Sequence, residues 1–232
     1  MKFEYLLFNL FILLGPSLAY FLYPKVVKLR PKVAIFSIGI SAFLFIVWDI
    51  IVTGHFWDFN HKYVLGYKLL TIPVEEALFF FTVPFACLFL YVNFIEKFEN
   101  SKRINVIPLI AISFFIILLS LIFLFFGKYY TFSVLLLLGI IWLSDLYFYK
   151  TSLVTRYTYW KFMALVLLLT AFFNYYLTSR PIVIYNNTLN INYRILTIPI
   201  EDFIYSICLM SLLLIIYEFI RSLKSRINKP KT

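Results

Sequence analysis

The sequence predicts an all-α integral membrane protein with about seven transmembrane helices, arranged as two parallel three-helix repeats joined by a linking helix. Three observations lead to this fold class. The chain of 232 residues is 63% hydrophobic and only 14% charged, with a mean hydropathy of +0.92, which is far outside the range of soluble proteins. Its apolar residues form seven runs of membrane-spanning length. One phrase of ten residues occurs twice.

The seven apolar runs each approach the roughly 20 residues that a helix needs to cross the hydrocarbon core. They cover approximately residues 3–23, 33–52, 73–95, 104–126, 129–149, 160–179 and 199–219. The fourth run has no charged residue between Arg103 and Lys128. The first run could also be a signal peptide, because residues 17–19 (SLA) are typical of a cleavage site. The repeat gives that run a counterpart and favours a helix.

Residues 67–76 (YKLLTIPVEE) and 193–202 (YRILTIPIED) form an internal repeat at an offset of 126, with six of ten positions identical. Each copy follows a long loop with an asparagine–aromatic phrase, at residues 58–60 and 185–187. Duplication of a three-helix unit explains this pattern. The predicted domains are listed in chain order: a first repeat at 1–100, a linking transmembrane helix at 101–128, and a second repeat with a basic tail at 129–232.

The linking helix determines how the two repeats are related. Two three-helix units joined directly would point in opposite directions. A single extra helix restores the direction, which makes the units parallel repeats about an axis normal to the membrane. Both proline–acid phrases then lie at the same depth on one side. We therefore expect their acids to face one shared cavity.

The basic residues indicate the orientation in the membrane. Fifteen of the 21 Lys and Arg residues fall on the side of the C-terminus and six on the other side. The positive-inside rule predicts an outer N-terminus and a cytoplasmic C-terminus, in the plasma membrane. Loops beside anionic lipid account for the formal net charge of +10. No nucleic acid partner is expected.

The proline–acid phrase has a structural interpretation. Pro73 and Pro199 suit the first turn of a helix. Acids that follow them complement the helix dipole and the free N–H groups of that turn. Capping alone would explain one acid in each copy, and this alternative remains open from the residues.

The phrase also has a catalytic interpretation, in which Glu75 and Glu201 are the predicted proton donors or acceptors and Glu76 and Asp202 their partners. Adjacent helical residues point about 100° apart, so one acid of a pair can cap while the other faces inward. Acids at a membrane boundary are costly unless they are paired or functional. Carboxyl groups crowded in a low-dielectric site cannot all ionise, so the cluster would contain both an acid and a base.

Further polar and aromatic residues are candidates for stabilising a substrate or a cation, because π-faces attract cations and an acid inside a membrane helix needs a partner. These candidates are Asp49, Trp48, Trp57, Asn60, Tyr67, Tyr193 and Phe203. Lys68 and Arg194 occupy equivalent positions and are predicted to orient the acids. Asp145 is interpreted as a boundary charge. His55 and His61 are too few for a metal site, so none is expected.

Several phrases carry a family resemblance: P-x-E-[ED] occurring twice, WDFN at 57–60, GYKLLTIPVEEALFF at 66–80, and IYNN with NYRILTIPIEDF in the second half. The chain resembles the membrane-embedded lycopene cyclases, in the form that fuses two small subunits into one chain. The resemblance covers both halves and the linking helix. One departure is Asn192, where the family pattern has glycine; we interpret it as a loop variation.

The resemblance implies a lycopene β-cyclase that converts lycopene to γ-carotene and β-carotene without net redox change. Its substrate would be lycopene or another acyclic carotenoid dissolved in the bilayer. Cyclisation needs a proton delivered to a terminal double bond and a proton removed from the resulting cation, which carboxyl groups can supply. No cofactor is expected, and the sequence has no G-x-G-x-x-G motif. A homo-oligomer and contacts with other carotenoid enzymes are left open.

Other classes of membrane protein fit less well. A retinal protein needs a lysine in the last helix, and none lies between Glu201 and Glu218. A polyprenyl transferase needs aspartate-rich magnesium sites, and no D-x-x-x-D occurs. A proton-coupled transporter or a non-catalytic membrane assembly protein remains an alternative, because parallel repeats and membrane carboxyl groups suit those functions too.

Overall fold

The computed structural model describes residues 2–24, 27–96 and 103–227, with side chains described as far as residue 223. Five of the basic residues counted above lie outside the described residues: Lys25, Lys97, Lys102, Lys229 and Lys231. The predicted domain boundary near residue 100 also lies outside them.

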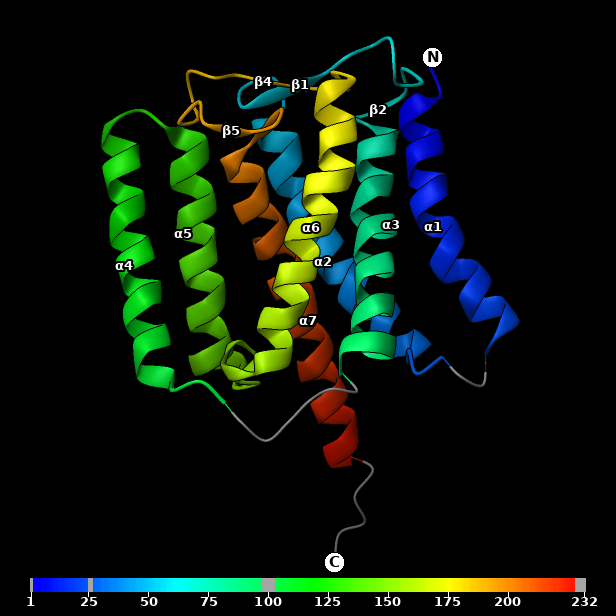
Figure 1. Ribbon diagram of the computed structural model, residues 1–232, viewed down its shortest axis with the longest axis vertical. Coiled ribbons are helices and arrows are strands. Elements are labelled where there is room, and N and C mark those ends of the chain that lie inside the picture. The colour runs from blue at the N-terminus through cyan, green and yellow to red at the C-terminus, as the bar shows by residue number, and fades with distance from the viewer. Residues whose placement is uncertain (1, 25–26, 97–102, 228–232) are drawn as a thin grey trace, which may run out of the picture.

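Seven helices of the described chain are long and apolar enough to cross a membrane, which confirms the predicted number (Figure 1). They are α1 (Glu4–Leu22), α2 (Pro31–Val52), α3 (Val74–Leu90), α4 (Val106–Phe125), α5 (Tyr129–Ser144), α6 (Tyr157–Ser179) and α7 (Ile200–Ile227). Short helical segments follow α3 and α5: η1 (Tyr91–Ile95), η3 (Asp145–Tyr149) and η4 (Leu153–Thr155).

The helices form a bundle in which α1, α3, α5 and α7 run in one direction and α2, α4 and α6 in the other (Figure 1). Both proline–acid phrases therefore begin at the same end of the bundle, called the motif end below. The two three-helix units, α1–α3 and α5–α7, are parallel, as the sequence predicts. Helix α7 packs against α2, α5 and α6. Helix α4 packs along α5 at one edge of the bundle.

Each motif begins as a very short β-hairpin that leads into a helix. The strands are β2 (Lys68–Leu69), β3 (Ile72–Pro73), β5 (Arg194–Ile195) and β6 (Ile198–Pro199). The turn residues Leu70 and Leu196 have left-handed φ angles of 57° and 59°. The helix follows each proline directly, because the fixed φ of proline suits a helix start. Both copies thus have the same backbone.

The Asn192 departure is explained by the same backbone. Gly66 and Asn192 are equivalent at an offset of 126, and their φ angles are 97° and 56°. Glycine adopts such angles freely, and asparagine is among the few other residues that adopt them routinely. The interpretation of Asn192 as a loop variation is consistent with this geometry.

A two-stranded sheet joins the long loops of the two repeats at the motif end (Figure 1). Strand β1 (Trp57–Phe59) pairs antiparallel with β4 (Val183–Tyr185), and Asp58 lies opposite Ile184 at the centre. These central residues are equivalent at the offset of 126, so the pairing has approximate two-fold symmetry. Alternating side chains point to opposite faces of a strand, and Trp57 and Phe59 are buried while Asp58 is exposed.

The outer surface of the bundle is apolar. Large hydrophobic side chains are exposed along the helices, among them Phe11, Phe36, Phe115, Leu168 and Phe172. Such a surface is unfavourable in water but suits contact with lipid tails. The chain is an integral membrane protein.

Candidate active site

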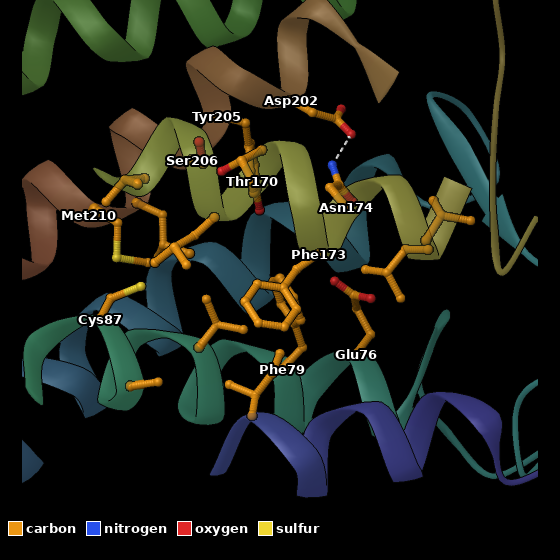
Figure 2. Close-up of a pocket in the computed structure, with 18 of the residues that line it drawn as sticks. Glu76, Phe79, Cys87, Thr170, Phe173, Asn174, Asp202, Tyr205, Ser206 and Met210 are labelled. Atoms are coloured by element: carbon orange, nitrogen blue, oxygen red, sulfur yellow. Dashed lines mark hydrogen bonds between the residues drawn. The ribbon is translucent and has the colours of Figure 1, made fainter. Parts of the chain in front are cut away.

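A cavity of about 470 Å³ lies between α1, α3, α6 and α7, and β1 and β4 cover it at the motif end. Its walls are mostly apolar. Asp49, Glu76 and Asp202 line it near the motif end, and they come from both repeats. Figure 2 shows Glu76 and Asp202 on opposite walls, with Phe79 and Phe173 nearby and with Cys87 and Met210 farther along. The structure thus brings together carboxyl groups that are far apart in the sequence.

Glu76 belongs to the first turn of α3 and is buried. Its Oε2 accepts a hydrogen bond from the hydroxyl of Tyr5, near the start of α1. Asp49, on α2, is only 1% exposed and interacts electrostatically with Glu76. Within the described chain, Asp49 Oδ2 is buried without a hydrogen-bond partner. An unpartnered carboxyl oxygen beside a cavity is available to a bound ligand.

Asp202 belongs to the first turn of α7 and accepts three hydrogen bonds. Its Oδ1 accepts from the Tyr130 hydroxyl at 2.8 Å. Its Oδ2 accepts from the Asn174 amide at 2.6 Å and from the Tyr185 hydroxyl at 2.5 Å. Figure 2 shows the hydrogen bond from Asn174 as a dashed line. Burial raises the pKa of Tyr185 well above its usual value, and the charge of Asp202 adds to this effect. Tyr185 therefore remains a donor at neutral pH.

The surroundings of Glu76 and Asp202 are related by the internal repeat. Tyr5 and Tyr130 lie at an offset of 125 in the sequence, and each donates to the second acid of one motif. Asp49 and Asn174 have the same offset, and both line the cavity. Asp202 thus has an amide, Asn174, beside it, whereas Glu76 has a carboxyl group, Asp49, at the equivalent position. The two halves of the site are similar in shape but different in charge.

The first acids of the motifs, Glu75 and Glu201, point toward the loops and do not line the cavity. Glu75 Oε1 accepts from the backbone N–H of Leu65 at 2.6 Å. Glu201 Oε1 accepts from the backbone N–H of Ile191 at 2.9 Å and from the Thr131 hydroxyl at 2.5 Å. These bonds hold each loop against its helix. The sequence predicts these two acids as proton donors or acceptors; in the structure they contact loops and lie outside the cavity lining.

Aromatic rings surround the carboxyl groups at the motif end of the cavity. The Trp57 ring lies 5.1 Å from the ring of Tyr130, 6.0 Å from that of Tyr185 and 6.2 Å from that of Tyr205. All four rings line the cavity. Aromatic faces stabilise a nearby cation by roughly 0.5 to 2 kcal/mol. Trp57 lines the cavity beside the carboxyl groups, and its role toward a substrate or cation stays a prediction.

Most of the other aromatic and polar candidates lie away from the cavity. Tyr67 and Tyr193 are 72% and 62% exposed. Trp48 packs against Phe56, and Phe203 is buried without lining the cavity. Asn60 lies in the loop after β1, where its side chain accepts from a backbone N–H.

The two predicted orienting residues make no direct hydrogen bond to the acids in the described structure. Lys68 is exposed on β2. Arg194 donates to the Thr197 carbonyl at 2.5 Å and to the Asn187 side chain at 2.7 Å. Its guanidinium also lies 5.7 Å from the centre of the Tyr185 ring. Tyr185, which donates to Asp202, is thus a contact through which Arg194 can influence Asp202.

Asp145 lies directly after α5, at the boundary position that the sequence predicts, and its side chain is fully buried. It accepts hydrogen bonds from the Thr151 hydroxyl and from the backbone N–H of Val154. Its position at the end of α5 is far from the motif end. Asp145 fixes the turn between α5 and α6. Among the described residues, no group of His, Cys, Asp and Glu is arranged to hold a metal.

Four residues at the site were missed by sequence reasoning: Tyr5, Tyr130, Asn174 and Tyr185. Asn174 could have been found, because an amide inside a membrane helix needs a partner just as a carboxyl does. Tyr5 and Tyr130 occupy equivalent positions in the two repeats, but the repeat is too weak there to reveal them. Tyr185 was noticed only as part of a loop phrase.

A comparison with known protein families shows which family the chain belongs to. The family model described as Lycopene cyclase matches residues 3–94 and again residues 127–220. The chain belongs to the lycopene cyclase family. No curated protein and no solved structure matches the chain. The first range contains α1 to α3, the second contains α5, α6 and α7 as far as residue 220, and α4 lies outside both. As a lycopene cyclase family member, the protein is an enzyme of carotenoid cyclisation.

Proposed function

We propose that this enzyme cyclises the acyclic end groups of lycopene to β-rings, giving γ-carotene and β-carotene. The observation that carries the proposal is the convergence of Asp49, Glu76 and Asp202 at one end of an otherwise apolar cavity. An apolar cavity in a membrane protein suits a polyene. The carboxyl groups lie where the end of such a chain would stop.

The proposed reaction begins when a protonated carboxyl group donates its proton to the terminal double bond of an end group. The resulting cation is attacked by the next double bond along the chain, which closes the ring. A carboxylate then removes a proton from the new cation and leaves the β-ring double bond. One proton is gained and one is lost, so the reaction needs no oxidant or reductant. Positioned acids and bases of this kind contribute typically 10²–10⁴-fold to a rate.

Hydrogen bonding suggests how the roles are divided. Asp202 accepts from three donors, an arrangement that suits an ionised carboxylate, which only accepts. We assign it to stabilising the cation or removing the proton. Asp49 and Glu76 interact with each other in a buried site, and a proton held between them relieves their repulsion. We assign this pair to donating the proton.

In this proposal Glu75 and Glu201 are positioning residues rather than proton donors. Each holds the loop that precedes its motif through a backbone N–H. Those loops lead from the strands that cover the cavity. The aromatic rings of Trp57, Tyr130 and Tyr205 are proposed to face the cationic intermediate.

We further propose that the motif end faces outward and the C-terminus lies in the cytoplasm of a plasma membrane protein. The uneven distribution of basic residues supports this orientation.

Expression in cells that accumulate lycopene tests the proposed function. Extracted pigments should contain γ-carotene or β-carotene when the intact chain is present, and only lycopene when it is absent. Lycopene that stays unchanged despite a normal level of membrane protein would contradict the cyclase proposal. That result would favour the transporter or assembly alternative.

A further inference from the structure

The cavity continues along α1 and α3, away from the carboxyl groups. On α1 it extends from Tyr5 to Pro16, and on α3 from Glu76 to Leu90. At a rise of 1.5 Å per residue these stretches are about 16 and 21 Å long. The cavity is thus a channel that runs from the motif end to roughly the middle of a ~30 Å hydrocarbon core.

Helices α1 and α6 meet near the motif end of this channel. Arg180 donates two hydrogen bonds to the Glu4 carboxylate, at 2.7 and 3.1 Å. The Phe8 ring stacks on Tyr176 with 5.7 Å between centroids and lies 6.0 Å from the ring of Phe173. These contacts close the gap between α1 and α6 at the level of the carboxyl groups.

Farther from the motif end, a slot remains between the two helices. Phe11, Gly15 and Pro16 border it on α1, and Val166 and Leu169 border it on α6; all five line the cavity. Phe11 and Gly15 are exposed on the outer surface as well. A side chain at Gly15 would meet nothing within 4 Å. The cavity therefore opens toward the lipid here.

The sequence of α1 helps to keep this slot open. Pro16 lies inside the helix, where it removes a backbone hydrogen bond and favours a bend. In Figure 1, α1 leans away from the bundle toward the end opposite the motifs. Gly15, next to Pro16, has no side chain that could fill the slot.

The equivalent space in the other half of the bundle is filled. Phe45 and Phe80 are buried there with their rings 6.3 Å apart. The corresponding residues on the open side, at offsets of 125 and 126, are the small polar Thr170 and Ser206, which line the cavity. The duplicated fold thus keeps one channel where its symmetry could have given two.

The edge of the second repeat is also covered. Gly139 lets α4 approach α5 so closely that an added Cβ would lie 2.5 Å from the Ile117 side chain and 2.9 Å from the Ser113 carbonyl. In the described structure no additional helix covers α1 in this way. Among the described residues, exposed side chains of α1 border the cavity, so the α1 side offers a path from the lipid to the carboxyl groups.

We propose that an acyclic carotenoid enters end-first from the bilayer through the slot between α1 and α6. The leading end group reaches the carboxyl groups, and the rest of the polyene stays in the channel and the lipid. One end is cyclised per entry, so a product with two rings requires release and a second entry from the other end. This inference rests on the proposed function and concerns how the substrate reaches the same site.

Blocking the slot tests this route. Gly15→Trp should lose at least about tenfold in conversion, because the indole occupies the opening. Gly39→Trp is the matched control, since Gly39 is also helical, has no atom within 4 Å of an added Cβ and lies outside the cavity. Conversion is measured per amount of membrane protein. Wild-type conversion by a well-expressed Gly15→Trp variant would overturn the proposal.

A second measurement uses the unaltered protein, so its result does not depend on whether Gly15→Trp accumulates. The substrate is an acyclic carotenoid with a sugar attached at one end. The free end should be cyclised at a rate similar to that of lycopene, because the bulky end stays outside. Cyclisation of lycopene without any cyclisation of the sugar-bearing substrate would overturn end-first entry. Failure to cyclise lycopene itself would instead refute the proposed function.

Discussion

Asp49 of α2 and Asn174 of α6 occupy equivalent positions in the two repeats, and both line the cavity beside the second acid of a motif. Asn174 donates to Asp202 at 2.6 Å. Asp49, by contrast, places a second carboxyl group near Glu76. The proposed base, Asp202, therefore has an amide beside it, whereas Glu76 of the proposed acid pair has the carboxyl group of Asp49 at the equivalent position.

Asp49→Asn should abolish the acid pair while preserving the shape of the site. The expected loss of conversion is on the order of 10²–10⁴, typical of removing a general acid. Asp58→Asn is the control, because Asp58 is exposed on β1 and its side-chain oxygen can still accept from the Phe59 N–H. Pigment analysis and protein level are measured together. Equal conversion by both variants would remove Asp49 from the mechanism.

Tyr185→Phe removes one donor to Asp202 but keeps the ring. A buried carboxylate that loses a partner costs about 1 to 3 kcal/mol, and 1.36 kcal/mol corresponds to tenfold in rate. We expect roughly a tenfold loss of conversion. Tyr193→Phe should be unaffected, because Tyr193 is 62% exposed. A normal rate for Tyr185→Phe would show that this hydrogen bond does not matter for catalysis.

The raised pKa of Tyr185 also bears on pH dependence. A group whose folded-state pKa is raised contributes stability that is present below its unfolded pKa, about 10 for tyrosine, and lost as pH rises through the folded value. Wild-type protein in detergent should therefore lose more thermal stability above about pH 10 than Tyr185→Phe does. Parallel pH curves for the two proteins would contradict burial of this phenol.

Deuterium labelling examines the proton-initiated reaction independently of any mutation. Carboxyl protons exchange with solvent, so cyclisation in D₂O should place deuterium in each new ring. Mass spectrometry of the product and of unreacted lycopene measures the label. Rings without solvent deuterium would require a different mechanism.

The sequence predicted much of the fold because helix length and an internal repeat are local signals. The seven apolar runs agree with the helices to within a few residues. The parallel arrangement followed from counting helices between Glu76 and Asp202. The pairing of β1 with β4 was not predicted, since three-residue strands have no periodicity to detect.

The site was predicted less completely, because tertiary contacts decide which of two adjacent side chains in a helical turn points into the cavity. Both acids of each pair were identified, but the sequence does not reveal that Leu65 and Ile191 supply N–H groups to the first acid. Those bonds turn the second acid toward the cavity. Likewise, Tyr67 and Trp57 are both aromatic residues near a motif in the sequence. Their burial distinguishes them, since Tyr67 is exposed and Trp57 is buried.

In the proposed mechanism, the second acid of each motif acts on the substrate while the first holds a loop. The most direct measurement compares lycopene conversion by Glu76→Gln and Asp202→Asn with that by Glu75→Gln and Glu201→Gln, each per amount of membrane protein. Gln at the first positions keeps an oxygen that can accept from the loop N–H. We predict losses on the order of 10²–10⁴ for the second-acid variants and conversion within a few-fold of wild type for the first-acid variants. The reverse pattern, with active second-acid variants and inactive first-acid variants, would contradict the account.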